Sequence, residues 1–360
     1  MKPEREAAMV RETTVDYERV VILENERLRA VVCPGHGASI LELVHRPTET
    51  QLLWQAPGGL RQPRDNLPAE YDNSTSFFDY YPGGCQIILP NGGPSVRHNG
   101  VELGFHGEAC KIAWKWSLTR RPGTAGVACE TFLRRVPLEV ALTYSLDDAA
   151  SCIQIETTVR NVSNAPVDCM WGLHPAYSEP FLGSRTRLHI RAGDVQAHPE
   201  QFGRQQHVRP GFRAQWPTGP DGGRLDYLFP GNGATADLVY LKCEEGWYVL
   251  HNEATGVAAT VTWDCELFPF VWFWQECQDA AGYPWFGRYH IVGVEPFTSY
   301  PSSGLVEALK HGNALRVAPS NSVSTVMRIG ATAFCTRKSL VVSGVKDEGS
   351  VIFQEGEQND

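Results

Sequence analysis

Apolar residues in this sequence occur in short runs, and within many of these runs apolar and polar positions alternate. Such alternation over a few residues is typical of a half-buried β-strand. No helical period is sustained long enough to indicate a substantial amphipathic helix. We predict strands over residues 20–23, 28–32, 39–43, 139–146, 152–162, 187–192, 236–242, 247–251, 257–263, 270–274 and 289–294, with a last pair near 322–330.

Turn residues separate the predicted strands at short intervals, in line with the 34 glycines and 24 prolines of the chain. Many short strands spaced in this way indicate a sandwich or a barrel. We therefore predict an all-β fold, a large antiparallel β-sandwich. No change in composition marks a linker, so we expect a single domain over residues 1–334, with a frayed start over 1–16. Residues 335–360 are polar and acidic, which indicates an appended tail.

Two stretches between the predicted strands have little periodicity and many turn residues. We expect residues 46–76 to form a long loop and residues 196–233 to be irregular.

Charge and composition exclude several classes of partner. A net charge of −9 and a pI near 5.7 argue against nucleic acid or an anionic membrane as the main partner. Residues 1–11 are charged and lack the apolar core of a signal peptide, and no apolar run approaches the ~20 residues of a membrane helix. We expect a soluble protein of the cytoplasm.

The ten cysteines are scattered, and none forms a Cys-x-x-Cys pair. Several lie inside predicted strands, which favours buried free thiols over disulfides. The histidines show neither His-x-His nor His-Glu-x-x-His spacing, so we predict no metal site.

Glu295 is the first candidate for chemistry. It follows the predicted strand 289–294 and precedes Pro296, and aromatic residues such as Trp285 lie shortly before it. A carboxylate among apolar groups resists ionisation, which suits a general base. The alternative is a surface carboxylate that caps a turn.

His174 is the second candidate. The polar turn Asn-Val-Ser-Asn-Ala-Pro over 161–166 leads to Trp-Gly-Leu-His-Pro over 171–175. Pro175 biases His174 to an extended backbone, so its imidazole can project from a strand. A purely structural histidine is the alternative.

Glycine pairs bracket a third stretch, residues 83–93, but it has no Gly-x-Gly-x-x-Gly and no Gly-Lys-Ser/Thr. Nucleotide binding is therefore disfavoured.

The order of these motifs resembles the aldose 1-epimerase (mutarotase-like) family, specifically its broader epimerase-like branch. The resemblance covers roughly residues 20–330. It consists of the paired glycines over 83–93, His106-Gly107, the 161–166 turn leading to His174-Pro175, and Gly-Val-Glu-Pro over 293–296.

The resemblance implies a β-supersandwich with a sugar cleft and an isomerase that needs no cofactor. His174 matches the family's general acid and Glu295 its general base. His106 matches the histidine that contacts sugar hydroxyls, and Asp226 lies where the family often has a substrate-binding aspartate. Trp274 or Trp272, which share one side of their strand, would stack on the sugar or belong to the core.

Departures from the family pattern leave the substrate open. The Asn-Arg pair of classical galactose mutarotases is missing before His106. The arginine that follows His-Gly in the branch acting on hexose phosphates is replaced by Cys110, although Lys111 is adjacent. The first departure puts a preference for galactose in doubt, and the second, together with the acidic chain, favours an unphosphorylated sugar.

We expect an enzyme that interconverts the α and β anomers of a small-molecule sugar, working as a monomer or homodimer. A non-catalytic carbohydrate-binding protein on the same scaffold and a hexose-phosphate mutarotase are the alternatives.

Overall fold

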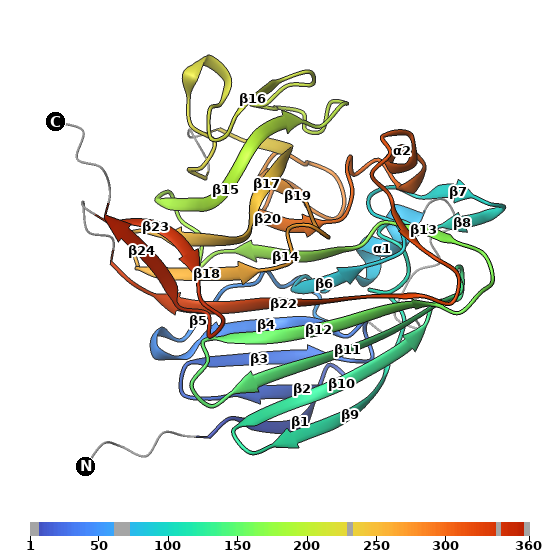
Figure 1. The fold of residues 1–360 in the computed structure, drawn as a ribbon. Helices are drawn as coiled ribbons and strands as arrows, with labels where there is room; N and C mark the ends of the chain where they lie inside the picture. The colour runs from blue at the N-terminus through green and yellow to red at the C-terminus, as the bar shows by residue number, and fades with distance from the viewer. Residues whose placement is uncertain (1–6, 61–72, 229–232, 336–339, 356–360) are drawn as a thin grey trace, which may run out of the picture.

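A computed structural model describes residues 7–60, 73–228, 233–335 and 340–355. It confirms the predicted all-β fold, a large antiparallel β-sandwich, because the strands of its main sheet pair antiparallel (Figure 1). Within these ranges the main sheet contains 18 strands: β1 (Met9–Val15), β2 (Glu18–Glu24), β3 (Leu28–Cys33), β4 (Ser39–His45), β5 (Thr50–Gln51), β6 (Cys85–Ile88), β9 (Lys115–Arg121), β10 (Thr124–Phe132), β11 (Leu138–Asp147), β12 (Cys152–Asn161), β14 (Gly172–Ser178), β15 (Thr186–Ala197), β16 (Arg213–Gln215), β17 (Thr235–Asn252), β18 (Val257–Thr262), β19 (Phe270–Cys277), β20 (His290–Phe297) and β22 (Ser322–Ala333).

In the described part of the chain, three two-stranded sheets accompany the main sheet. They pair β7 (Val96–His98) with β8 (Val101–Leu103), β13 (Val167–Cys169) with β21 (Leu315–Val317), and β23 (Leu340–Val345) with β24 (Val351–Glu355).

The burial of each strand follows its sequence pattern. In β11, buried and more accessible positions alternate from Leu138 to Asp147, as expected for a strand with one face in the core. All seven positions of β14, by contrast, are buried, and so are seven of the eight in β20. The strands that carry His174 and Glu295 therefore lie covered on both faces, inside the molecule.

The sequence predicts Glu295 at the end of a strand, but the residue lies within β20. The strand continues through Pro296, which pairs with Val271 of β19, to Phe297. A proline removes one donor from the ladder but leaves its neighbours free to pair, so a single proline did not end this strand.

Parts of the predicted loop over 46–76 are ordered into elements. Residues Arg46–Thr48 form a 3-10 turn, β5 follows, and α1 (Asn73–Tyr80) begins near the end of the stretch, while residues 61–72 lie outside the described residues. A helix of eight residues shows too little periodicity to be predicted from its sequence. A second short helix is α2 (Leu305–Lys310).

The stretch 196–233 is largely irregular, as predicted, over the residues that are described. It contains the end of β15, the short β16 and a 3-10 turn over Pro220–Gly222.

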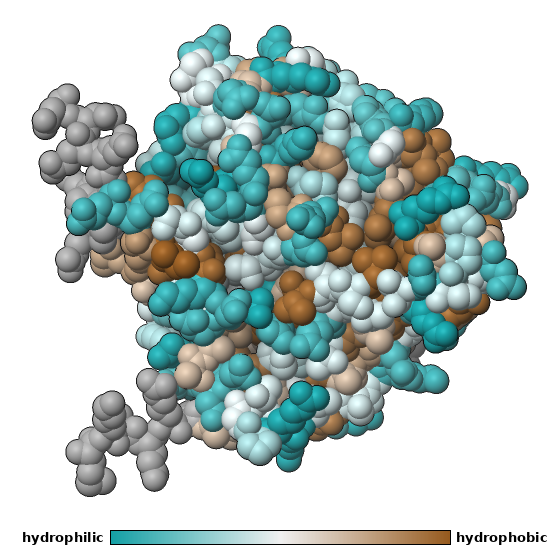
Figure 2. Space-filling view, viewed as in Figure 1, coloured by the Kyte–Doolittle hydropathy of each residue, from teal (hydrophilic) through white to brown (hydrophobic). Residues whose placement is uncertain are grey.

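The C-terminal segment forms the β23–β24 hairpin and is not an appended tail over residues 340–355. Val342 packs with Trp247, Val249 and Ala258 of β17 and β18, and Phe353 joins this cluster. In the hydropathy view, apolar side chains gather where β18 and β23 lie and again near α2 (Figure 2). The alternating apolar residues of the hairpin are diluted by charged neighbours, which is why composition alone indicated a tail.

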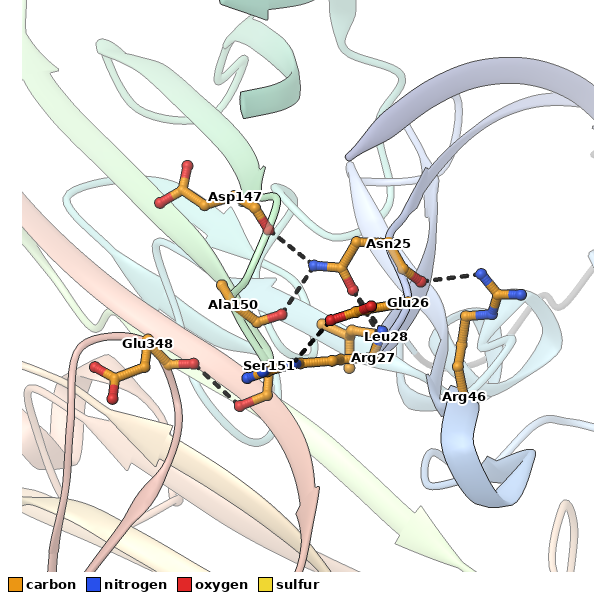
Figure 3. A network of polar contacts seen from close by, with 9 residues as sticks. All are labelled: Asn25, Glu26, Arg27, Leu28, Arg46, Asp147, Ala150, Ser151 and Glu348. Carbon is orange, nitrogen blue, oxygen red and sulfur yellow. Dashed lines mark hydrogen bonds and ion pairs between the residues drawn. The ribbon is translucent and has the colours of Figure 1, made fainter. Parts of the chain in front are cut away.

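A polar network ties the turn of this hairpin to the main sheet (Figure 3). The Ser151 hydroxyl donates to the Glu348 carbonyl (3.0 Å), next to the turn after β11. In that turn the carbonyls of Asp147 and Ala150 accept hydrogen bonds from the amide of buried Asn25 at 2.8 and 2.9 Å. Three chain segments that are distant in sequence meet here.

All ten cysteines are free, and eight of them are buried, which confirms the prediction of free thiols. Within the described ranges no helix has the length and hydropathy needed to span a membrane.

Candidate active site

A cavity of roughly 550 Å³ opens between α1, the loop before β9 and strands β14, β17, β19 and β20. Aromatic rings form much of its wall, including those of Phe77, Tyr81 and Trp285. Five of the six residues singled out from the sequence line this cavity: His106, His174, Trp272, Trp274 and Glu295.

His174 and Glu295 face each other across adjacent strands. The register pairs Gly172 with Phe297 and Ala176 with Gly293, which places His174 opposite Glu295. The His174 Nε2 atom lies 3.6 Å from Glu295 Oε1, and both side chains are buried. This separation is just beyond a direct hydrogen bond, so a hydroxyl group can bridge the two side chains.

Gly293 creates the space that the Glu295 carboxylate occupies. A Cβ atom at Gly293 would lie 2.3 Å from Glu295 Oε1 and 3.2 Å from Cε3 of Trp274. The carboxylate therefore folds back along β20 to the level of Trp274, whose pairing partner is Gly293.

Burial shifts the proton affinities of the pair in opposite directions. It raises the pKa of Glu295 well above its usual 4.5 and lowers the pKa of His174 to about 4. Both shifts disfavour the charged forms, so the empty site favours a neutral imidazole beside a protonated carboxyl. The pair then holds one proton, with a basic imidazole and an acidic carboxyl side by side.

His106 lies beside this pair in a defined orientation. Its Nδ1 atom accepts a hydrogen bond from the Gly93 amide at 3.0 Å, and its ring centroid is 5.3 Å from that of His174. Burial, followed by the neighbouring His174 and Lys111, lowers the pKa of His106 well below its usual value. A neutral imidazole that accepts at Nδ1 carries its hydrogen on Nε2, so His106 is prepared to donate there.

The two tryptophans of β19 are held differently. Trp272 stacks on Phe297 with ring centroids 3.6 Å apart and donates from Nε1 to the Ser299 carbonyl. Trp274 is partly exposed and lies 6.3 Å from the His174 ring, measured between centroids. Trp274 is thus the better platform for a ligand in the cavity.

Asp226 does not reach this cavity, which corrects the expectation drawn from the family resemblance. Its carboxylate accepts hydrogen bonds from Arg187 at 2.9 Å and from Arg224 at 2.6 and 2.8 Å. Arg187 pairs with His251 near the end of β17, whereas the cavity is lined by Ala236 and Leu238 at the start of that strand. Asp226 therefore anchors arginines at the opposite end of β17.

Several polar residues of the cavity were not singled out from the sequence. Glu276 and Asp279 are buried carboxylates in its wall, and Arg204 and His198 also line it. A sequence signal existed only for Glu276, which continues the alternation of Trp272 and Trp274 along one face of β19.

Comparison with known families shows which family the chain belongs to. The model of a family described as a domain of unknown function, DUF4432, matches residues 17–331. The chain belongs to the DUF4432 family. No curated protein matches this DUF4432 member.

Solved structures similar to this DUF4432 member share its fold at low sequence identity. The protein Slr1438 from Synechocystis sp. PCC 6803 is 17% identical, with a TM-score of 0.62 over 93% of this chain and 98% of that one. A candidate aldose 1-epimerase from Klebsiella pneumoniae is 13% identical, with a TM-score of 0.68 over 92% and 85% of the two chains. A galactose mutarotase-like protein from Clostridium acetobutylicum is 14% identical, with a TM-score of 0.63 over 91% and 99%. The fold is that of the galactose mutarotase-like proteins, which confirms the fold that the resemblance of the sequence motifs implied.

Among the described residues, no group of three or more His, Cys, Asp or Glu side chains is arranged to hold a metal ion.

Proposed function

We propose that this protein is an aldose 1-epimerase-like isomerase that interconverts the α and β anomers of a small sugar. The observation that carries the proposal is the buried pair of His174 and Glu295, 3.6 Å apart at the wall of an aromatic cavity. Its fold neighbours, one of which is described as a candidate aldose 1-epimerase, support the same assignment.

The reaction needs one base at the C1 hydroxyl and one acid at the ring oxygen O5. The base removes the proton from the C1 hydroxyl while the acid protonates the ring oxygen O5. The C1–O5 bond then breaks, and C1 becomes a carbonyl carbon. Rotation about C1–C2 and reversal of both proton transfers close the ring as the other anomer. Each positioned proton transfer contributes about 10²–10⁴-fold to the rate.

A pair that shares one proton can serve in either of two arrangements. With Glu295 ionised and His174 protonated, the carboxylate is the base and the imidazolium the acid, as the family resemblance implies. With both groups neutral, which burial favours, the imidazole is the base and the carboxyl the acid. The two forms have the same total charge, so both belong to one protonation state of the pair.

The neighbouring groups would complete the site. Trp274 offers an apolar surface for a ring face of the sugar, and the Nε2–H of His106 is available to a substrate oxygen. A neutral sugar also suits the absence of an arginine after His106-Gly107, where Cys110 stands.

Polarimetry with fresh α-glucose and α-galactose tests the proposal. We expect the protein to accelerate the approach to equilibrium and Glu295→Gln to lower kcat by at least ~10²-fold. Exposed Glu130 on β10 provides a matched control, because Glu130→Gln removes a carboxylate outside the cavity. No acceleration with any common aldose would refute the enzyme. Sugar binding that survives in Glu295→Gln, without turnover in either protein, would instead identify a carbohydrate-binding protein.

The dependence of the rate on pH follows from the same pair. Activity requires that His174 and Glu295 together hold one proton. The rate should therefore fall as the pH drops through about 4, where His174 becomes protonated and the pair holds two protons. It should also fall at high pH, once Glu295 ionises while His174 is neutral. The pH dependence of kcat/KM, measured by polarimetry, checks both limbs.

A further inference from the structure

Glu276 is a buried carboxylate of the cavity that the proposed chemistry does not use. It lies on β19 two residues beyond Trp274 and four beyond Trp272, so all three side chains share one face of the strand. Its Oε1 atom accepts a hydrogen bond from the Ala280 amide at 2.9 Å, which fixes the carboxylate in the cavity wall.

The spacing along β19 matches the size of one sugar ring. The Glu295 carboxylate folds back to the level of Gly293 and Trp274, as the close approach to Gly293 shows. Glu276 lies two residues further along, or about 7 Å at the rise of a strand. A pyranose stacked on Trp274 with C1 at Glu295 and His174 therefore presents the hydroxyls of its far end to Glu276.

We propose that Glu276 binds a hydroxyl at the end of the sugar remote from C1 and restricts the site to sugars without an anionic substituent there. This inference rests on the proposed function, because it uses Glu295 and His174 to define where C1 lies. A carboxylate accepts hydrogen bonds from hydroxyls, and its charge strengthens them.

The charges around Glu276 explain the exclusion of anions. Asp279, also buried in the wall, accepts hydrogen bonds from the backbone amides of Arg204 and Gln205. Arg204 Nε donates to the Asp279 carbonyl and lies 3.9 Å from its carboxylate, so its positive charge faces a negative one. A phosphate or carboxylate on the sugar would meet Glu276 and Asp279 without a net positive partner.

Kinetics with glucose and its monodeoxy derivatives test the role of Glu276. We expect Glu276→Gln to lower kcat/KM for glucose by about tenfold, mainly through KM, because a charge-assisted hydrogen bond is lost. For the one deoxy sugar that lacks the contacted hydroxyl, wild type and Glu276→Gln should have the same kcat/KM. A purely structural role of Glu276 predicts an equal loss with every sugar, and that result would overturn the proposal.

The preference between glucose and glucose 6-phosphate tests the charge. Wild type should have a higher kcat/KM for glucose than for glucose 6-phosphate. Glu276→Gln should lower the ratio of these two values, whereas Glu130→Gln should leave the ratio unchanged. A wild-type preference for the phosphate, or an unchanged ratio in Glu276→Gln, would overturn the proposed selectivity.

Binding of 1-deoxyglucose separates this inference from the catalytic proposal. The sugar has no C1 hydroxyl and cannot be turned over, and tryptophan fluorescence can report its binding near Trp274. Weaker binding to Glu276→Gln than to wild type supports the role of Glu276 even if no aldose is epimerised. Equal binding to both proteins, or none to either, would overturn it.

Discussion

At the scale of single residues, the cavity contains ionisable groups whose burial disfavours their charged forms. Glu295 and His174 line a cavity whose wall is largely aromatic, and they lie 3.6 Å from each other. Such opposed shifts in pKa are typical of acid–base sites, because they keep a base and an acid available at the same pH. The cost is a site that is less stable than an apolar core would be.

The stability of the protein should reveal this cost through Glu295. Its pKa is raised in the folded protein, so the unfolded chain loses this proton at a lower pH than the folded chain does. Stability from this group is therefore complete below about pH 4.5 and declines by about 1.4 kcal/mol per pH unit up to the raised pKa. Glu295→Gln, which cannot ionise, should gain stability relative to wild type as the pH rises from 5 towards the raised pKa.

Urea denaturation of both proteins across this pH range measures the difference. Glu130→Gln, at an exposed position, should show no such trend. A difference between Glu295→Gln and wild type that does not change with pH would contradict the burial effect on Glu295.

A glycine next to the site should matter for activity more than for the fold. Gly293→Ala places a Cβ atom 2.3 Å from Glu295 Oε1, so the carboxylate must move. Moving a catalytic group by about 1 Å lowers the rate on the order of 10²-fold, and we expect a loss of that order in Gly293→Ala. Polarimetry of Gly293→Ala checks this.

Gly282 supplies the control for this prediction, because it also lines the cavity but a Cβ atom there meets nothing within 4 Å. Gly282→Ala should retain near wild-type activity. Equal rates for Gly293→Ala and wild type would show that the carboxylate position is not critical.

At the scale of elements, two adjacent strands carry the proposed acid–base pair and a third carries the proposed binding surface. β14 and β20 place His174 and Glu295 opposite each other, and the alternation along β19 aligns Trp272, Trp274 and Glu276. A shift of register by one residue would turn all of these side chains to the other face. The buried position of these strands makes such a shift costly.

The β23–β24 hairpin covers β17 and β18 at a distance from this machinery. Val342 is buried against Trp247 and Val249, so Val342→Asp would bury a charge without a partner. We expect a loss of about 2–4 kcal/mol in the free energy of unfolding, with little change in kcat/KM of the folded protein. Urea denaturation and polarimetry measure the two effects.

Val341, exposed on the same strand, is the matched control, and Val341→Asp should be nearly neutral. A loss of stability in Val341→Asp as large as in Val342→Asp would contradict the docking of this hairpin on the main sheet.

At the scale of the whole molecule, the long strand β17 separates the candidate active site from the ion-pair cluster around Asp226. β17 spans 18 residues, with the cavity at its start and the Asp226 cluster near its end. A residue can therefore match a family position in sequence and still lie far from the proposed sugar site.

Asp226→Asn tests this separation. The amide lacks the charge that holds Arg187 and Arg224, so we expect a loss of about 1–3 kcal/mol in stability. KM and kcat should be unchanged, because the cluster does not touch the cavity. A clear increase in KM without a loss of stability would restore Asp226 as a substrate-binding residue.

Much of the architecture follows from local patterns. Alternation of apolar and polar residues indicated the strands and the all-β fold, because the side chains of a strand point to opposite faces. Short helices such as α1 and the C-terminal hairpin were missed, since eight residues carry little period and charged neighbours mask a short apolar face. Pro296 suggested a strand end that the paired neighbours in β19 and β20 overrule.

The sequence by itself determined the fold class, the free cysteines and, through the order of its motifs, the resemblance that singled out His174, Glu295 and His106. Only the tertiary structure decided which polar residues share the cavity. It brought in Glu276 and left Asp226 with two arginines, because pairing between strands distant in sequence sets which side chains meet. The register of β14 against β20 likewise set the 3.6 Å separation of His174 and Glu295, which no spacing along the chain specifies.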